Sequence, residues 1–427
     1  MTTEIQSKSP SWLPIVILGA LFFIFGFVTW LNGTLIQYLK IACELNTFQS
    51  LLVAFAFYIS YFVMALPSSW ILERTGFKKG MMLGLMVMSV GALIFIPAAI
   101  TRTYSIFLLG LFIIGTGLSI LQTASNPYIT ILGPLESAAM RISIMGICNK
   151  VAGVSAPIFL GAIVLSDADH LTKELQTLGG AEKTALLDSL AHRVIVPYIF
   201  IAVTLLGLSL LIRYSSLPEV EEEDHGEVDS ADSLAKHEGK SSVFQYPNLM
   251  LGVLAIFLYV GVEVLAGDTI GTYGRALGIP LSLTKNFTAY TLTAMVIGYI
   301  LGILTIPKII HQDKALAISA LVGVIFSITV QLTAGYTSVL FIALLGLANA
   351  LMWPAIWPLA IEGLGRFTKT GSALLIMGIA GGALLPLLYG RLADISSIGH
   401  QKAYWILIPC YLYILYYSLR GHKMKHW

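Results

Sequence analysis

Long apolar runs recur along almost the whole chain, and they limit what it can fold into. A helix needs about 20 mostly apolar residues to cross the hydrocarbon core of a bilayer, and twelve segments of the sequence meet that requirement. Their approximate bounds are 13–39, 49–72, 80–100, 104–132, 142–165, 194–215, 247–267, 286–307, 315–334, 338–361, 371–393 and 403–420. The sequence therefore predicts an all-α membrane protein with twelve transmembrane helices.

Composition supports a membrane protein and excludes several other classes. Of the 427 residues, 57% are hydrophobic and 11% are charged, against about 25% charged in an average soluble protein. The net charge of +2 gives no electrostatic reason to expect nucleic acid as a partner. The three cysteines are far apart and show neither metal-ligand nor redox spacing. We expect a lipid bilayer around the chain, no cofactor and no enzymatic activity, since no nucleophile-base pair or phosphate-binding loop is evident.

An acidic stretch divides the twelve segments into six and six. It contains EVEEEDHGEVDSADSLAKHEGKSS, which is too polar to cross a bilayer. We expect an N-terminal six-helix bundle over 1–214, a cytoplasmic acidic linker over 215–246 and a C-terminal six-helix bundle over 247–427. The N-terminus is a short polar tail without a small-residue cleavage site, which favours a retained first span over a signal peptide.

The positions of Lys and Arg predict the orientation. With a cytoplasmic N-terminus, fifteen of the 25 Lys and Arg residues fall inside, nine fall outside, and Lys150 lies within a span. Cytoplasmic loops carry the excess of basic residues. We therefore expect both termini and the linker in the cytoplasm, and the long loop over 166–193 outside.

One stretch places a polar cluster at membrane depth. The fourth segment reads LQTASNPYITILGP and carries Gln122, Thr123, Ser125 and Asn126 directly before Pro127. Polar side chains are costly in hydrocarbon unless they face protein or a wet cavity. The cluster predicts a binding site for something polar; the alternative is an interhelix hydrogen-bond cluster on a kinked helix.

The loop between the second and third segments resembles the signature loop of the major facilitator superfamily. It reads SWILERTGFKKG, and its acidic and basic residues take the positions that latch helix ends at the cytoplasmic face in that superfamily. The alternative is an ordinary basic hairpin with no special role. Glu362 and Arg366 would be the equivalent in the second half. The predicted latch residues are Glu73, Arg74, Lys78, Lys79, Glu362 and Arg366.

Longer motifs carry a closer resemblance. QTASNPYITILGP, RISIMGICNKVAGVSAP, FLYVGVEV and PLAIEGLGRFTKTGSALLIMGIAGGALLPLLYGRLAD resemble the fucose-galactose-glucose symporter family, and the similarity extends over nearly the whole chain. Within that family the sequence is more similar to the glucose/galactose branch than to fucose permeases. The resemblance implies a monomeric secondary transporter of the bacterial cytoplasmic membrane, which moves a hexose by alternating access and uses an ion gradient.

Two positions depart from the fucose permeases in a way that affects coupling. That branch uses an Asp in the first span and a Glu in the fourth as its proton-coupling pair. The matching positions here are Gly33 and Gln122. Neither side chain can exchange a proton at accessible pH, so the resemblance does not carry a proton mechanism to this sequence.

Few ionisable residues remain within the spans, and each is a candidate for function. Glu263 and Asp268, with the hydroxyl of Thr269, suit a hard cation such as sodium, and Gly267 and Gly271 would allow the helix to unwind there. Glu263 has the alternative of a structural salt bridge or a sugar-hydroxyl acceptor. Asp268 has the alternative of a solvated residue near a helix end.

Lys150 in the fifth span has three readings. A buried ammonium needs a partner or loses its proton. It pairs with a carboxylate across the cavity, donates to sugar hydroxyls, or extends toward the cytoplasm.

Sugar recognition requires amides, carboxylates and aromatic faces. Trp353 and Trp357 are four residues apart and so share a helix face, which Asn349 would also share; the alternative is that both indoles face lipid or pack between helices. The predicted sugar ligands are Asn32, Gln37, Gln122, Asn126, Asn149, Lys150, Tyr259, Glu263, Asn286, Tyr290, Asn349, Trp353 and Trp357.

These features together predict a hexose symporter of the glucose, galactose or mannose class, with sodium favoured as the co-substrate. A proton-coupled symporter and an uncoupled facilitator are the alternatives within the same fold. A non-transporting sugar sensor that signals through the linker is the alternative from another class.

Overall fold

The computed structural model describes residues 12–131, 138–215, 241–306 and 309–427, and every regular element in these ranges is a helix. We call residues up to 215 the N-half. Its helices are α1 (Trp12–Trp30), α2 (Asn32–Ala42), α3 (Thr47–Thr101), α4 (Tyr104–Ile131), α5 (Ala138–Val164), α6 (Ala168–Thr177), α7 (Gly180–His192) and α8 (Ile195–Tyr214).

Residues from 241 onward form the C-half, whose helices are shorter and more often interrupted. Its elements are η2 (Val243–Gln245), α10 (Pro247–Asp268), α11 (Ile270–Ala276), α12 (Leu281–Thr284), α13 (Phe287–Thr305), α14 (Gln312–Leu332), α15 (Gly335–Asn349), α16 (Met352–Ile361), η3 (Gly365–Phe367), α17 (Thr368–Met377), η4 (Gly378–Ala380), α18 (Gly381–Ala393), α19 (Gly399–Ala403), η5 (Tyr404–Ile406), α20 (Leu407–Leu419) and η6 (Gly421–Lys423).

The all-α prediction is confirmed, and the predicted segments map onto the helices with two differences. Ten stretches of the described residues are long and apolar enough to cross a membrane, and they cover eleven of the twelve segments, because α3 contains both the second and the third. The twelfth is divided among α19, η5 and α20, and α20 alone has 13 residues. Most of the predicted linker, residues 216–240, lies outside the described residues.

A single glycine turns the chain between the second and third spans. Gly76 has φ 75° and ψ 172° within the 55 residues of α3. This backbone conformation is open to glycine and strained for other residues. The start of α3 is fixed by a capping box, in which the Asn46 side chain accepts from the Gln49 backbone and the Gln49 side chain accepts from the Asn46 backbone.

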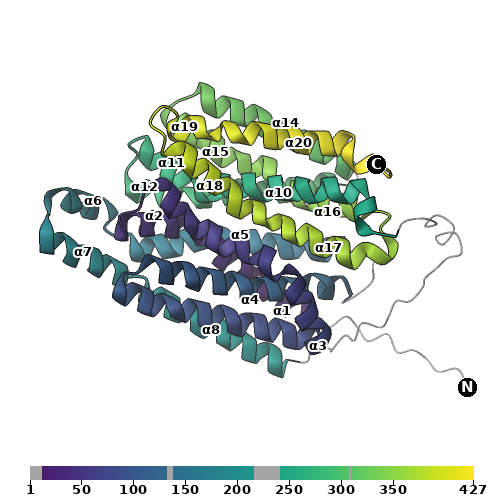
Figure 1. Ribbon diagram of the computed structural model, residues 1–427, viewed down its shortest axis with the longest axis horizontal. Coiled ribbons are helices and arrows are strands. Elements are labelled where there is room, and N and C mark those ends of the chain that lie inside the picture. Colours follow the sequence, from purple (N-terminus) through teal and green to yellow (C-terminus); the bar gives the residue numbers. More distant parts are fainter. Residues whose placement is uncertain (1–11, 132–137, 216–240, 307–308) are drawn as a thin grey trace, which may run out of the picture.

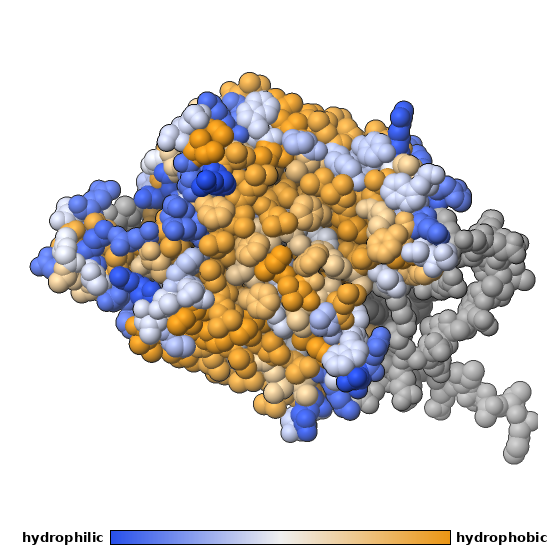
Figure 2. All heavy atoms as spheres, in the orientation of Figure 1, coloured by the Kyte–Doolittle hydropathy of each residue, from blue (hydrophilic) through white to orange (hydrophobic). Residues whose placement is uncertain are grey.

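The long helices lie side by side in one bundle, with α6 and α7 at one end and the C-terminus at the other (Figure 1). We call these the α7 end and the C-terminal end. Figure 2 shows apolar side chains around the middle of the visible face and polar ones gathered at both ends. An exposed apolar band of this extent marks a surface that contacts a membrane.

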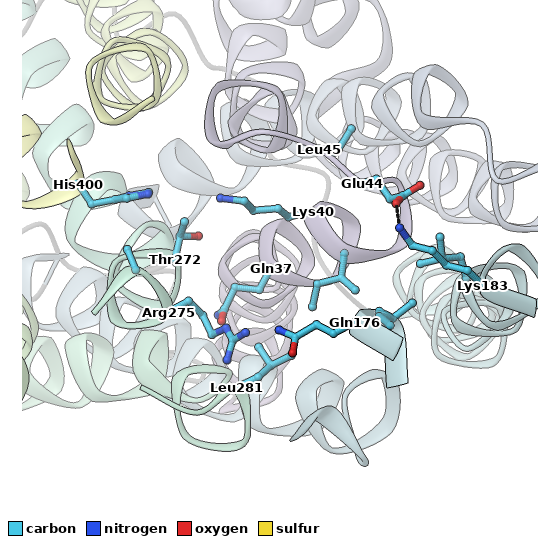
Figure 3. A pocket seen from close by; sticks show the side chains of 14 residues that line it. Gln37, Lys40, Glu44, Leu45, Gln176, Lys183, Thr272, Arg275, Leu281 and His400 are labelled. Atoms are coloured by element: carbon cyan, nitrogen blue, oxygen red, sulfur yellow. Dashed lines mark ion pairs between the residues drawn. The ribbon is translucent and has the colours of Figure 1, made fainter. Parts of the chain in front are cut away.

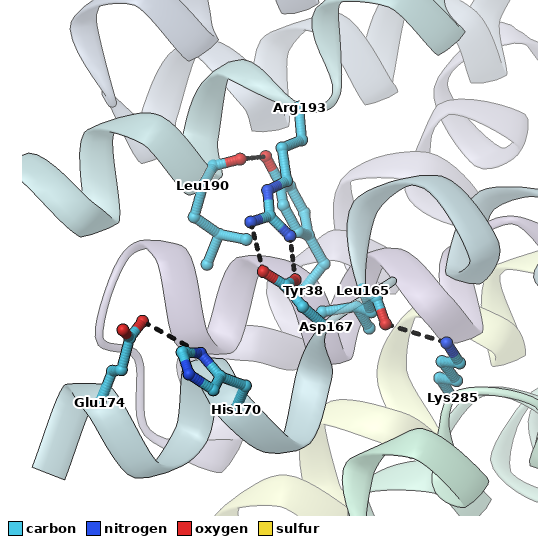
Figure 4. Close-up of polar contacts among 8 residues, drawn as sticks. All are labelled: Tyr38, Leu165, Asp167, His170, Glu174, Leu190, Arg193 and Lys285. Carbon is cyan, nitrogen blue, oxygen red and sulfur yellow. Dashed lines mark hydrogen bonds and ion pairs between the residues drawn. The ribbon is translucent and has the colours of Figure 1, made fainter.

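The α7 end is held together by polar contacts (Figure 4). Asp167, just before α6, pairs with Arg193, just after α7. The hydroxyl of Tyr38 on α2 lies 2.9 Å from the Leu190 carbonyl oxygen. The loop over 166–193 therefore contains two helices, of which α7 packs on α2 and α6 contacts α12.

Candidate functional site

A buried ion pair joins the two halves. The Lys150 ammonium on α5 lies 2.7 Å from a carboxylate oxygen of Glu263 on α10, and each side chain is 10% exposed. The same ammonium lies 4.6 Å from the ring centroid of Trp30, within cation–π range. Charge-assisted hydrogen bonds of this length are among the stronger polar contacts in proteins. The three alternatives for Lys150 are an ion pair, a sugar contact and extension toward the cytoplasm. In the structure Lys150 forms the ion pair, with Glu263 of the other half.

A row of aromatic rings lies beside this pair in the C-half. Tyr259 is one turn before Glu263 on α10, and its ring centroid is 6.3 Å from that of Trp353 on α16. The Trp353 and Trp357 rings stack at 5.4 Å, as their spacing predicts. Both indoles are half-buried. The row places aromatic faces close to a carboxylate and an ammonium, which is the combination that a sugar requires.

Asn349 is the last residue of α15, and Trp353 lies in the first turn of α16. Asn349 is fully buried and accepts a hydrogen bond of 2.8 Å from the Tyr411 hydroxyl. The prediction assumed one continuous helix, whereas α15 ends at Asn349 and α16 begins at Met352. The hydrogen bond from Tyr411 joins Asn349 to α20, and a face shared with Trp353 stays a prediction.

The amides predicted in the N-half are mostly engaged within the protein. The Gln122 amide donates to the Tyr61 hydroxyl at 3.1 Å, and the Asn149 amide donates to the Phe22 carbonyl at 3.4 Å. Gln37 donates to the Thr284 carbonyl at 3.2 Å and so links the halves. Buried Asn32 has an amide nitrogen with no hydrogen-bond partner.

Where the structure describes them, the remaining predicted site residues have no shown contact with the Lys150–Glu263 pair or the aromatic row. The polar stretch of the fourth span lies on α4, where the Ser125 hydroxyl is buried without a partner. The side chain of Asn126 lies outside what the structure describes, as do residues 132–134 of that motif. Asn286 is a half-buried residue directly before α13. Tyr290 is 53% exposed and borders an apolar pocket of α13 and α15, so its role as a sugar ligand stays a prediction.

Asp268 is the most unusual side chain of the candidate site. It is 0% exposed, and neither carboxylate oxygen has a hydrogen-bond partner. The reading of Asp268 as a solvated residue is therefore wrong. The helix is interrupted where Gly267 and Gly271 predict it, because α10 ends at Asp268 and α11 begins at Ile270.

The hydroxyls around this break differ in their availability. Thr269 donates to the Leu265 carbonyl at 2.7 Å and lies 2.6 Å from the Tyr404 hydroxyl. Its oxygen thus serves the packing of the break. The hydroxyl of Thr272, one turn after Asp268, is buried with no partner. From the sequence, Thr269 and not Thr272 is predicted as a cation ligand. Thr272 is four residues after Asp268, a spacing that places two side chains on the same face of a helix.

The predicted latch residues lie at the C-terminal end and make contacts within their own half. Lys78 donates to the Ser215 carbonyl at 2.8 Å, and the Arg74 guanidinium lies 3.8 Å from the Trp70 ring centroid. Glu362 lies 3.8 Å from Lys425. Glu73 and Lys79 are exposed, and the side chain of Arg366 lies outside what the structure describes.

The α7 end carries direct polar bonds between the halves, which sequence reasoning missed. Thr34 donates to the Lys285 carbonyl at 3.3 Å. Figure 4 shows the Lys285 ammonium donating to the Leu165 carbonyl, at 2.9 Å. The Asp394 carboxylate accepts from the backbone N–H groups of Thr47 at 3.2 Å and Phe48 at 2.8 Å. These bonds join the two halves at this end of the bundle.

A cavity of about 500 Å³ lies beside these bonds (Figure 3). Gln37 and Lys40 of α2 border it from one side, and Thr272 and Arg275 of α11 from the other. His400 completes its rim. The cavity reaches from the α7 end to the hydroxyl one turn away from Asp268.

Comparison with known proteins gives a family match over most of the chain. Residues 17–388 match the model described as the Major Facilitator Superfamily. The chain is 35% identical to a glucose/galactose transporter of Brucella abortus over 99% of this chain and 97% of that protein. It is 29% identical to the L-fucose-proton symporter of Escherichia coli over 90% of this chain and 88% of that protein.

Solved structures agree with the fold. A crystal structure of the Escherichia coli fucose–proton symporter superposes with a TM-score of 0.73 at 27% identity, covering 96% of this chain and 98% of that one. A D-xylose–proton symporter gives a TM-score of 0.72 at 15% identity, covering 97% and 98%. The second likeness concerns the fold alone.

Proposed function

Because this chain belongs to the Major Facilitator Superfamily, and within it to the fucose-galactose-glucose symporters, we propose that it imports a hexose by alternating access and is driven by a cation gradient. The chain is a membrane sugar transporter and not an enzyme. The substrate class that we favour is glucose, galactose or mannose. The name of its relative in Brucella abortus, a glucose/galactose transporter, supports this class.

The observation that carries the proposal is the Lys150–Glu263 pair beside the aromatic row. Carboxylate and ammonium groups bond sugar hydroxyls, while an aromatic ring covers the apolar side of a sugar. Because the two charged groups belong to different halves, a hexose that bonds both would change how the halves are held together. Binding at this position is thereby linked to the rearrangement that alternating access requires.

Sodium is the coupling cation that we favour. Gly33 and Gln122 stand at the positions of the proton-coupling carboxylates and cannot titrate. Glu263 and Asp268 supply oxygen donors of the kind that hard cations prefer. The fucose relative is named a proton symporter, so a proton is the alternative cation, and an uncoupled facilitator is the alternative without one.

We place the transporter as a functional monomer in the bacterial cytoplasmic membrane, with both termini in the cytoplasm. The excess of Lys and Arg at the C-terminal end supports this orientation. The α7 end then faces outside. In this orientation its interhalf bonds would close the outer side of the transport path.

The test is uptake of radiolabelled glucose into proteoliposomes of the purified protein. An inward sodium gradient is compared with an equal choline gradient, with matched pH on both sides. We expect sodium-dependent accumulation above the equilibrium level. Equal, non-accumulating entry in both buffers would favour the facilitator, unless a pH gradient restores accumulation and identifies the proton. Absence of glucose, galactose and mannose transport under all three gradients contradicts the proposal.

A further inference from the structure

The buried charges of the described residues do not balance. Among the Lys, Arg, Asp and Glu residues that the structure describes, the buried ones are Lys150, Glu263 and Asp268. Lys150 and Glu263 neutralise each other through their 2.7 Å contact. Asp268 is left without a cationic partner, so the three groups in their ordinary charge states sum to one negative charge.

A buried carboxylate in this situation has to acquire a cation. Transfer of an unpaired charge into a low-dielectric interior costs several kcal/mol or more, and a carboxyl group avoids this cost by taking up a proton or a metal ion. Both oxygens of Asp268 lack a hydrogen-bond partner in the protein. Their lone pairs are therefore available to a ligand from solution.

The surroundings of Asp268 supply further polar groups that are equally unengaged. The Thr272 hydroxyl is buried without a partner, and its oxygen can ligate a cation; the buried Asn32 amide nitrogen also lacks a partner, but it is a hydrogen-bond donor and could only bond the carboxylate. Thr272 lies one turn further along, and Asn32 begins α2, which packs against α10 and α11.

The cavity at the α7 end comes within one helical turn of Asp268. Thr272 and Gln37 border the cavity of about 500 Å³ (Figure 3). Asp268 is one helical turn from Thr272, and the helix is interrupted between them at Thr269. A cation that enters the cavity therefore needs only a local movement at this break to reach the carboxylate.

Glu263 is less suited to hold the cation. A mobile cation at Glu263 would have to displace an ammonium that is tethered 2.7 Å away and also faces the Trp30 ring. Thr269 is less suited than Thr272, since its hydroxyl already has two partners. The two acidic residues of α10 therefore have different roles.

We propose that Asp268 is the single coupling site, that it binds one monovalent cation, and that one cation crosses with each hexose. Glu263 serves the sugar and the contact between halves, with Lys150 as its counter-ion in this structure. This inference rests on the proposed function and narrows it to one carboxylate and one stoichiometry. The ligand chemistry is shared by sodium and the proton, and the experiment separates them.

The first measurement is accumulation by wild type and Asp268→Asn in proteoliposomes without membrane potential. A tenfold cation gradient that moves one cation per sugar sustains about tenfold accumulation, and two cations would sustain about a hundredfold. We expect a plateau of about tenfold for wild type, which follows either the sodium or the pH gradient and so names the cation. We expect Asp268→Asn to exchange hexose across the membrane without accumulating it. Asp313→Asn, a carboxylate in the first turn of α14, is the matched control.

The second measurement does not depend on the sugar. Thermal unfolding of the purified protein is followed in sodium against choline chloride and across a pH series. We expect a cation-dependent rise in unfolding temperature for wild type and for the control Asp313→Asn, and none for Asp268→Asn, whose neutral amide keeps the shape of the side chain.

The outcomes separate the inference from the proposed function. Accumulation by Asp268→Asn, a wild-type plateau near a hundredfold, or a cation response that persists in Asp268→Asn would each overturn the inference while hexose symport stands. A wild type that moves no hexose but shows an Asp268-dependent cation response sinks the hexose proposal and supports the cation site.

Discussion

The Lys150 ammonium and the Glu263 carboxylate, 2.7 Å apart and each 10% exposed, form an ion pair between α5 and α10. Neither group is close enough to water to lose its partner without cost. Substitution of either residue should therefore lower the stability of the fold as well as change transport.

Removal of one charge should destabilise the protein more than removal of both. Loss of one partner of a buried pair costs roughly 3–5 kcal/mol, because the other charge stays buried alone. We expect Lys150→Gln and Glu263→Gln to unfold at lower temperature than wild type, and the double variant to recover most of the difference. Thermal unfolding in detergent measures this. Single variants as stable as wild type would show that the pair is solvated.

Replacement of Gly33 by a residue with a side chain should impair transport. A Cβ at this position would lie 2.2 Å from the Thr288 hydroxyl oxygen of the other half. Overpacking of this kind costs about 1–3 kcal/mol. We expect Gly33→Ala to slow hexose exchange at least about fivefold, with partial recovery in Gly33→Ala/Thr288→Ala. Gly207→Ala is the control, since nothing lies within 4 Å of its added Cβ. Full activity of Gly33→Ala would contradict this close approach.

Asp394→Ala should loosen the α7 end. The carboxylate bonds two free N–H groups in the first turn of α3, and such contacts at helix N-termini contribute about 1 kcal/mol. We expect roughly fivefold faster labelling of a cysteine placed at Thr34, which is fully buried in this closed arrangement.

The reporter for that experiment is a protein in which the three native cysteines are replaced and a membrane-impermeant thiol reagent is added from the α7 side. Asp188→Asn is the control, because Asp188 pairs with Arg102 within the N-half. An unchanged labelling rate in Asp394→Ala would mean that this contact does not hold the halves together.

Acidification should weaken the α7 end through His400. Burial, together with the charge of Lys40, lowers the pKa of this imidazole from 6.5 to about 4, and the Asp394 charge opposes the shift. The Tyr389 hydroxyl lies 3.3 Å from its Nδ1. The folded state disfavours the protonated ring, so its contribution to stability is complete above pH 6.5 and is lost as the pH falls toward 4. We expect the unfolding temperature to fall more steeply over this range in wild type than in His400→Gln; parallel curves would exclude the effect.

Trp353 should contribute to sugar affinity more than to turnover. Its ring is between those of Tyr259 and Trp357, and an aromatic contact contributes about 0.5–1.5 kcal/mol. We expect Trp353→Ala to raise the half-saturating glucose concentration up to about tenfold. Trp405→Ala, at a ring that is 52% exposed, is the control. Equal effects of the two variants would remove Trp353 from the sugar site.

Features that depend on composition and period were predictable from the sequence. The apolar segments predict the helices, and the spacing of Trp353 and Trp357 predicts a shared helix face, on which their rings lie 5.4 Å apart. The glycines on either side of Asp268 predict the break there. In each case the signal is local, because it depends on residues within one or two helical turns.

Contacts between distant segments were not predictable in the same way. Asp394 bonds backbone groups almost 350 residues away, and the Thr288 and Thr291 hydroxyls donate to the carbonyls of Gly267 and Ala266 at 2.8 and 3.0 Å. A backbone acceptor leaves no mark in the sequence. The burial of Asp268 was missed for a related reason, since its depth depends on how α10 and α11 pack against the N-half.

The unpaired carboxylate of Asp268 also decides which part of the cycle a voltage acts on. With its cation bound, the buried cluster of three charged groups is neutral, and the loaded protein rearranges without moving net charge. Without the cation, the cluster carries one negative charge, and an electric field acts on it by up to about 2.3 kcal/mol per 100 mV. In a cell with a negative interior, the field therefore speeds the return of the empty carrier to the outside.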